Sequence, residues 1–390
     1  MAALLADCVE VRNTDSKKGR GLFAKSHIQK DQVIFKEAPL VSCQFAWNEF
    51  YKYTACEHCL RSLEPAEAMA RRLTENPCLV LPHPECCGVR QDLIVNCPNC
   101  GMIYCSVECY QSAIEKYHKC LCIGSSRDDT DHPINKVIES WRNIHYPPES
   151  ANIMLLLKMI AMVKQSDDPM PLLNDFSRFV QTTVNEEEQA IHKLLSHQEH
   201  LELMRSLVTE SMYDDKVKQW FTGDGFRSMF ALMGTNQQGI GSSSISVWVK
   251  NCEKLPLPGE EKQQLDQFID QLYEDLEKVS DTFLNCEGVG LYKAQSSCNH
   301  SCAPNAEIQF LNENHTLSLV ALEDIEPEQE VCISYLDACE IDRSRHTRQK
   351  ILKENYLFTC NCPKCISQAD DEDVTSEDED DDDDEDMEES

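Results

Sequence analysis

Cysteine and histidine pairs crowd the stretch between residues 56 and 122, at spacings that suit a metal ion. Each pair places two soft ligands within one turn of backbone, close enough to share a tetrahedral Zn²⁺. The four pairs supply enough ligands for two zinc ions, and few apolar positions here are periodic, so we expect this stretch to need metal in order to fold. The pairs are Cys56-x2-Cys59, Cys97-x2-Cys100, Cys105-x3-Cys109 and His118-x3-Cys122.

A third cysteine group stands near the end of the chain, at Cys360-x-Cys362-x2-Cys365. Three thiolates leave a tetrahedral zinc one ligand short. The missing ligand must come from a remote part of the sequence, and Cys302 is our candidate. All three sites would then be filled by protein ligands, so we expect structural zinc with no open position for catalysis.

The 22 cysteines also bear on the compartment. The N-terminus turns acidic at once and has no basic leader, so we expect no export and reduced thiols, which at CxxC spacing bind metal more often than they pair. The longest apolar run, near residues 153–163, is interrupted by Lys158 and is too short to span a bilayer. We therefore expect no membrane contact.

Residues 299–305, Asn-His-Ser-Cys-Ala-Pro-Asn, are the most specific string in the chain. They resemble the NHSCxPN motif of SET-domain methyltransferases. The turn at residues 19–24 resembles the N-terminal GxG turn of that family, and residues 330–335 resemble its late strand, which ends on the active-site tyrosine. The Cys360 cluster resembles its post-SET zinc site. All four stand in the order that the family uses.

The paired cysteines and histidine resemble the MYND zinc finger, a cross-braced module in which ligand pairs alternate between two metals. The resemblance implies one site of Cys56, Cys59, Cys105 and Cys109, and another of Cys97, Cys100, His118 and Cys122. The stretch from Cys59 to Cys97 is far longer than in other MYND fingers, and it contains further candidate ligands. Those that could compete are Cys78, His83, Cys86 and Cys87, and Cys120 lies beside the second site.

A MYND module inserted into a SET sequence is similar to the SMYD family, over roughly residues 9–366. The acidic tail, the long insertion and the missing C-terminal helical-repeat domain resemble the fifth branch of that family. The resemblance implies an α+β fold with a pseudo-knot in the SET β-structure. The expected parts are 9–52 (SET, N-terminal part), 53–122 (MYND), 123–283 (helical SET insert), 284–340 (SET core), 341–366 (post-SET zinc segment) and 367–390 (disordered acidic tail).

The resemblance also implies an S-adenosylmethionine-dependent protein-lysine N-methyltransferase. Methyl transfer needs a neutral amine, whereas a free lysine has a pKa of about 10.4. A narrow apolar channel lowers that pKa by desolvation, so alignment and exclusion of water would supply most of the rate. The Tyr335 hydroxyl is expected to orient the methyl group and the amine. The alternative, a catalytically weak MYND/SET peptide-binding scaffold or transcriptional regulator, is disfavoured by Tyr335 together with Asn299 and His300.

Further site residues follow from the resemblance. Tyr356 is expected to line the lysine channel, and Phe358 to pack on the adenine. An upstream asparagine should also contact the donor, and both Asn236 and Asn285 remain candidates. The expected donor-binding residues are therefore Gly19, Arg20, Gly21, Asn299, His300, Tyr335 and Phe358, with Asn236 or Asn285.

The net charge of −32 is concentrated at the end of the chain, because residues 370–390 hold 16 acids and no base. Even without that tail the chain is acidic, which suits a basic protein partner and not a nucleic acid. Residues 53–122 also lack the basic stripe of a DNA-binding finger. We expect histones and ribosomal proteins as substrates, Pro-rich peptides as MYND partners, a monomer, and a place in cytoplasm and nucleus.

The elements that must position these residues can be outlined. We expect strands within residues 9–45 and 288–335, and mostly helix from 130 to 235. One helix should begin at Ser150 and end before Ser166, and another should start from a capping box of Asn185 and Glu188. Residues 234–244 predict a loop. An amphipathic helix should follow Pro258, and one last helix should span 343–358.

Overall fold

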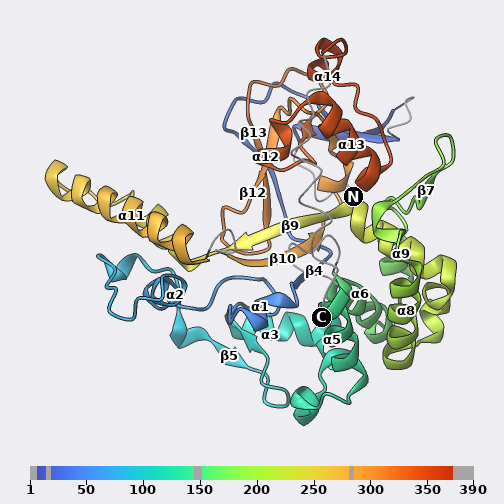
Figure 1. The fold of residues 1–390 in the computed structure, drawn as a ribbon, viewed down its shortest axis with the longest axis horizontal. Coiled ribbons are helices and arrows are strands. Elements are labelled where there is room, and N and C mark those ends of the chain that lie inside the picture. Colours follow the sequence, from blue (N-terminus) through green and yellow to red (C-terminus); the bar gives the residue numbers. More distant parts are fainter. Residues whose placement is uncertain (1–6, 15–18, 145–151, 281–284, 372–390) are drawn as a thin grey trace, which may run out of the picture.

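The computed structural model describes residues 7–14, 19–144, 152–280 and 285–371. Small sheets form the centre, a helical region covers one side of them, and a long helix extends from the other side (Figure 1). The C-terminal helices sit above the sheets in that view. Most of the predicted acidic tail, from residue 372 onward, lies outside the described residues. No helix in the part that is described has the length and apolar character needed to cross a membrane.

Strands near both ends of the chain build the central sheets, as predicted. β1 (Val9–Asn13) pairs with β2 (Arg20–Ala24). β3 (Val33–Glu37) pairs with β13 (Leu317–Ala321), which also pairs with β12 (Ala306–Gln309). β4 (Val41–Gln44) pairs with β10 (Cys286–Leu291). Strands from the two ends of the chain thus complete each other's sheets across the residues between them.

The loop predicted at residues 234–244 is wrong. α9 (Gly223–Asn236) runs into it, and β9 (Gln237–Ser242) then pairs along the whole of β10. Ile240 and Ser242 are buried while Gly239 and Gly241 are exposed, which is the period of two of a half-buried strand. Glycine and serine content concealed this strand, because tertiary pairing overrides weak local preference.

A short parallel pair brings the two most specific motifs together. β11 (Asn299–His300) lies beside β14 (Cys332–Ile333), with Asn299 opposite Cys332. The Asn305 side chain fastens the same contact, since its Nδ2 donates to Glu330 O at 2.9 Å and its Oδ1 accepts from Cys332 N at 2.8 Å. This is the juxtaposition that the SET pseudo-knot requires.

The cysteine-rich module contains short elements, as expected of a metal-dependent fold. They are α1 (Trp47–Phe50), α2 (Ala66–Leu73), η1 (Pro84–Cys86), η2 (Gln91–Leu93), β5 (Val95–Asn96), β6 (Ile103–Tyr104), α3 (Val107–Ala113), η3 (Ile114–His118), α4 (Lys119–Leu121) and η4 (Gly124–Asp128). The insertion after Cys59 has an apolar core of its own. There, Met69 of α2 and Leu81 pack with Trp248 of α10 (Ser244–Cys252) and Leu272 of α11 (Gly259–Ser280).

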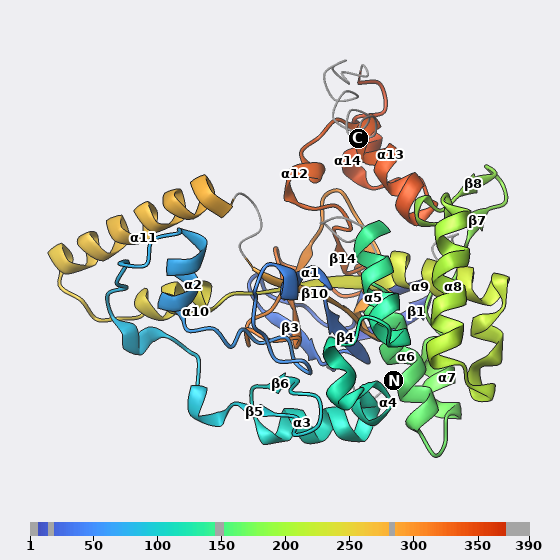
Figure 2. The ribbon, with the colours of Figure 1, turned by 60° about the horizontal axis from the view of Figure 1, so that its bottom comes forward.

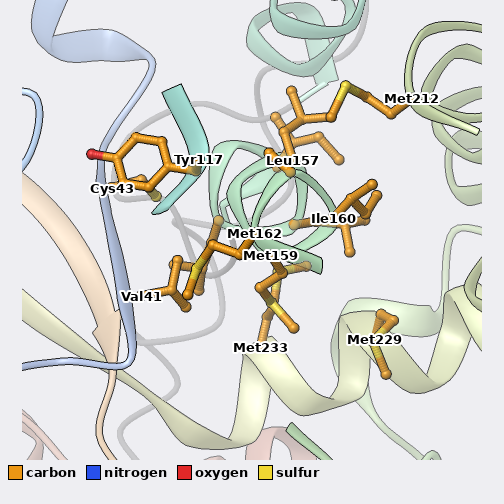
Figure 3. Packing of buried hydrophobic residues seen from close by; sticks show 14 of the residues in the cluster. Val41, Cys43, Tyr117, Leu157, Met159, Ile160, Met162, Met212, Met229 and Met233 are labelled. Atoms are coloured by element: carbon orange, nitrogen blue, oxygen red, sulfur yellow. The ribbon is translucent and has the colours of Figure 1, made fainter. Parts of the chain in front are cut away.

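The helical region begins with α5 (Pro133–Ile144) and α6 (Ile153–Gln165), followed by α7 (Met170–Phe176), α8 (Gln198–Met212) and η6 (Asp215–Phe221). α6 is buried on all sides. The helix contacts β4, α8 and α9 (Figure 2). Its Leu157, Met159, Ile160 and Met162 lie among side chains of those elements (Figure 3). The predicted Ser150 cap lies outside the described residues, and Asn152 caps the helix by accepting from Met154 N at 2.8 Å. The helix ends before Ser166, as predicted.

The only charged side chain in the middle of α6 ties three parts of the molecule together. Lys158 is fully buried, and its Nζ donates to Ser42 O at 3.1 Å and Glu57 O at 2.9 Å, and pairs with Glu57 Oε1 at 2.8 Å. Its ammonium also lies 4.7 Å from the centre of the Tyr117 ring. The SET strand β4, the zinc module and the helical region therefore meet at one buried cation.

The helix predicted to start at Asn185 is wrong. Asn185 Oδ1 does accept from the backbone N–H groups of residues 187 and 188, at 3.1 and 3.4 Å, as a cap would. The chain then reverses, with Gln189 at φ 54°, into a hairpin of β7 (Val184–Asn185) and β8 (Ala190–Ile191). The turn η5 (Lys193–Leu195) follows, and α8 begins only at Gln198.

The helices predicted near the C-terminus are confirmed. α11 buries Leu265, Ile269, Leu272 and Leu276 along one face. α12 (Ala338–Ile341) and α13 (Arg345–Tyr356) follow the last strand, and α14 (Pro363–Ser367) carries the final cysteine. α13 ends at Leu357, whose φ of 60° turns the chain toward the cysteines.

Candidate active site and zinc centres

Two groups of four metal-binding side chains form in the cysteine-rich module. They are Cys56, Cys59, Cys105 and Cys109, and Cys97, Cys100, His118 and Cys122, with the ligand atoms of each group within 4.8 Å of one another. These are the cross-braced sets that the MYND resemblance implied. Neighbouring sulfurs lie 3.4 to 3.8 Å apart. Two sulfurs bound at about 2.3 Å to a tetrahedral zinc lie ~3.8 Å apart, so both groups fit Zn²⁺.

The third group joins Cys302 to Cys360, Cys362 and Cys365, as predicted, again within 4.8 Å. Cys302 Sγ lies 3.5 Å from Cys365 Sγ and 4.0 Å from Cys360 Sγ. Gln349 of α13 holds the Cys360 backbone from both sides, through its Nε2 to the carbonyl at 2.7 Å and its Oε1 to the N–H at 2.8 Å. Four cysteines complete a closed zinc site, which suits a structural metal.

The other cysteines near the zinc module stay out of these sites. Among the residues that the structure describes, no further group of three or more metal-binding side chains includes Cys78, His83, Cys86, Cys87 or Cys120. Cys86 packs in the apolar cluster around Trp248. The long insertion packs through an apolar contact with α10 and α11.

The predicted glycine turn lies directly against the NHSC segment. Gly19 has a φ of +72°, which favours glycine. A Cβ on Gly21 would lie 2.8 Å from Glu330 Oε1 and 3.3 Å from Asn299 Nδ2, so any larger residue would displace these side chains. The Arg20 guanidinium reaches away to Arg178 O at 2.6 Å. The turn thus forms a tight wall beside the expected donor site.

Glu330, a residue that the sequence reasoning did not single out, positions Asn299. The Asn299 amide nitrogen donates to Glu330 Oε1 at 2.6 Å and to Arg20 O at 2.9 Å. Both N–H groups of this amide are therefore used within the protein. Only the amide oxygen or the backbone of Asn299 can contact S-adenosylmethionine. Glu330 stands inside the strand motif of residues 330–335, and that position was the signal available in the sequence.

The His300 ring links the zinc side of the site to the tyrosine. Its Nδ1 accepts the backbone N–H of Tyr335 at 2.9 Å, so the neutral ring carries its proton on Nε2. That nitrogen lies 3.3 Å from Cys302 Sγ. An N–H aimed at a zinc-bound thiolate is a common outer contact of such centres. The ring therefore positions Tyr335, because both of its nitrogens are already used.

Tyr335 stands at the centre of an aromatic group. Its hydroxyl donates to Cys298 O at 2.7 Å, and its ring centre lies 4.9 Å from that of Tyr356 and 6.2 Å from that of Phe358. The Phe358 ring lies 6.0 Å from His300. Burial raises the pKa of Tyr335 well above its usual range, so the hydroxyl stays protonated. It can accept and orient, but it is not a base.

The helical region holds the other side of this aromatic group. Asn185 Nδ2 donates to Leu357 O at 3.2 Å, between the two predicted aromatic residues, and Lys353 pairs with Glu188 at 3.1 Å. Tyr356 turns its hydroxyl toward Tyr335 O at 3.4 Å. Burial raises the pKa of Tyr356 to about 12. Asn185 was missed as a site residue because its cap-like spacing suggested a helix start.

The two candidate asparagines lie at opposite ends of β9 and β10. Asn236 adjoins Gln237, which pairs with Leu291 on the side that leads to the NHSC segment. Its amide nitrogen donates to Val180 O at 2.9 Å, two residues from the carbonyl that Arg20 reaches. Asn285 precedes the far end of β10, about five residues of strand away, or ~17 Å. The structure therefore brings Asn236, and not Asn285, to this side.

The residues brought together can bind a donor and shield a methyl transfer. The Gly21 wall, the Asn299 segment and Phe358 surround Tyr335 from separate parts of the chain. Aromatic faces and protonated hydroxyls exclude water without offering a strong base. Such a lining suits displacement on carbon with a neutral amine better than hydrolysis.

Comparisons with known proteins agree with this geometry. The SET domain family matches residues 19–336. "Protein-lysine N-trimethyltransferase SMYD5" of Danio rerio is 55% identical over 97% of this chain and 91% of that protein. Its counterpart of the same name in Homo sapiens is 57% identical over 95% and 89%. "Histone-lysine N-methyltransferase SMYD3" of Mus musculus is 40% identical over 27% of this chain and 26% of that protein.

One solved structure, of the SET domain of LSMT bound to lysine and AdoHcy, also aligns with the chain. It is 10% identical with a TM-score of 0.31, over 92% of this chain and 55% of that chain. A similarity at this level supports no inference about the site.

Proposed function

This chain belongs to the SMYD family of SET-domain proteins, and from that premise we propose that it trimethylates lysine side chains of basic proteins. The family and its fifth branch, predicted from the motifs, are confirmed, and the chain is a protein-lysine N-methyltransferase. Its cofactors are S-adenosylmethionine and zinc at three sites. The degree of methylation and the choice of substrate are the proposed part.

The observation that carries the mechanism is the position of Tyr335 between the NHSC segment and the aromatic group. S-adenosylmethionine supplies an electrophilic methyl group on a sulfonium. The Tyr335 hydroxyl donates its hydrogen bond to Cys298 O, so the lone pairs of the hydroxyl oxygen can accept from the amine and from polarised C–H groups. With its raised pKa it does not take the lysine proton, so that proton leaves to water before the amine is enclosed.

Trimethylation is supported by the relatives at 55% to 57% identity, which are named protein-lysine N-trimethyltransferases. It requires that the amine rotate and re-enter after each transfer. The test is intact-mass spectrometry of a lysine-rich protein substrate after incubation with the enzyme and donor. Accumulation of the trimethylated form supports the proposal, and arrest at one methyl group contradicts it.

Basic substrates, namely histones and ribosomal proteins, are supported by the acidic surface. Glu186 and Glu187 are exposed on the hairpin that contacts the aromatic group, and Glu340 lies close enough to Tyr356 to act on its pKa. Attraction between an acidic enzyme surface and a basic substrate speeds their encounter, and salt screens this attraction. We expect kcat/KM for a lysine peptide with basic flanks to fall as salt rises. A preference for acidic flanks, independent of salt, would contradict this.

Three further assignments belong to the proposal. Pro-rich peptides are proposed as partners of the zinc module, supported by the exposed aromatic side chains of Phe50 and Tyr51 beside it. We also propose a monomer, and a place in both cytoplasm and nucleus. Titration of a Pro-rich peptide into the wild type and into Phe50→Ala tests the first assignment, light scattering the second and fractionation of cells the third. Absence of binding to the wild type, a dimer, or confinement to another compartment would contradict the respective assignment.

A further inference from the structure

A buried arginine stands beside the third zinc site, and none of the described carboxylates pairs with it. Arg348, in the first turn of α13, is 1% exposed and is among the largest fully buried side chains. Removing a guanidinium from water costs several kcal/mol unless a counter-charge compensates it. Within the described part of the chain, no acidic side chain forms an ion pair with it. Its counter-charge must therefore be of another kind.

The contacts of the guanidinium point to the thiolates. Nη1 donates to Arg343 O at 2.5 Å and Nη2 donates to Gln368 Oε1 at 2.7 Å, but both of these oxygens are neutral. Nη2 also lies 3.8 Å from Cys365 Sγ, within the distance of a hydrogen bond to sulfur. Cys365 Sγ is in turn 3.5 Å from Cys302 Sγ. Thiolates are thus the anions nearest to this cation.

The zinc centre itself needs a positive neighbour. Four thiolates around Zn²⁺ carry a formal charge of about −2. This centre lies in an apolar cluster with Leu336 and Leu352, where an uncompensated charge is costly. The buried guanidinium and the zinc–thiolate group therefore stabilise each other, and each accounts for the burial of the other.

We propose that Arg348 is a positioning residue of the third zinc centre, which balances the thiolate charge and so keeps the zinc bound. The effect reaches the active site through one neighbour. Cys302 faces His300 Nε2 at 3.3 Å, and His300 Nδ1 holds the Tyr335 N–H at 2.9 Å. Retention of this zinc therefore sets the position of Tyr335.

The test measures zinc release from the full-length protein to a chromogenic chelator, beside total zinc by elemental analysis. Arg348→Met removes the charge, Arg348→Lys keeps it on a chain of similar length, and Lys350→Met is the control because Lys350 is exposed on the same helix. The other two zinc sites in each sample serve as internal standards.

We expect Arg348→Met to release one zinc of the three at least tenfold faster, and the other two at the wild-type rate. Arg348→Lys should lie between it and the wild type, and Lys350→Met should match the wild type. Equal release from Arg348→Lys and Arg348→Met would show that packing and not charge matters, and would overturn the proposal. Wild-type release from Arg348→Met, or equal acceleration of all three zincs, would overturn it as well. Should Arg348→Met not fold, Arg348→Gln replaces it as the neutral variant, and the same outcomes support or overturn the proposal.

Discussion

Replacing Asn185 with aspartate separates the two functions of this side chain. The structure has Oδ1 accepting from the backbone N–H groups of residues 187 and 188, which aspartate preserves. It also has Nδ2 donating to Leu357 O at 3.2 Å, which aspartate cannot do. Asn185→Asp would instead turn a second carboxylate oxygen toward that carbonyl. The hairpin should keep its shape while its hold on the segment between Tyr356 and Phe358 is lost.

The size of the effect follows from one hydrogen bond. Its loss costs about 1 kcal/mol, and leaving the Leu357 carbonyl without its donor brings the total to about 1–2 kcal/mol. That corresponds to a fall of roughly 5- to 30-fold in the population with an ordered channel. We expect kcat/KM for a lysine peptide to fall by this factor, with the donor Kd within about twofold, because the Gly21 wall and Asn299 are unaffected.

The assay is steady-state kinetics with a labelled donor, beside calorimetry of donor binding. Gln189→Glu is the matched control, because it makes the same amide-to-acid change at an exposed position of the same turn. Wild-type kcat/KM in Asn185→Asp would refute the reasoning. An equal loss in Gln189→Glu would refute it too, since added charge alone would then explain the effect.

Other perturbations test other parts of the site. Gly21→Ala should weaken donor binding at least fivefold by calorimetry, since its Cβ would lie 2.8 Å from Glu330 Oε1 and overpacking costs about 1–3 kcal/mol; unchanged affinity would contradict the tight wall. Log kcat/KM should rise with pH as the substrate amine loses its proton. It should not fall near pH 10, because the pKa of Tyr356 is raised to about 12. A fall in that range that Tyr356→Phe removes would contradict this. Lys158→Met should lower the free energy of unfolding by about 3–5 kcal/mol, because the largely buried Glu57 loses its partner. Adding Glu57→Gln should restore part of that loss, and strict additivity of the two changes in denaturant titrations would argue against the pair.

The zinc ligands could be predicted because their signal is local. The spacing of a pair such as Cys97 and Cys100 is enough to predict metal binding, and only a few combinations of pairs make a tetrahedral site. Even the remote ligand Cys302 was predictable, since three thiolates require a fourth. Within the described residues, the structure adds no other cluster of this kind.

The missed elements depend on contacts between distant residues. β9 is a strand because it pairs with β10, and its glycine- and serine-rich sequence does not predict that pairing. Asn185 makes the same backbone contacts in a hairpin turn as in a helix cap, so spacing cannot distinguish the two. Arg348 looked like one base among several in a polar helix. Only the fold shows that it faces the thiolates.

The central claim is that Tyr335 orients the methyl transfer and does not bind the donor. The most direct measurement compares turnover and donor affinity in Tyr335→Phe, which removes the hydroxyl that donates to Cys298 O at 2.7 Å. We predict that the wild type transfers label to lysine, that turnover in the variant falls at least about tenfold, or about 1.4 kcal/mol, and that the donor Kd stays within about threefold. A collapse of donor affinity in the variant, or wild-type turnover without the hydroxyl, would contradict the account.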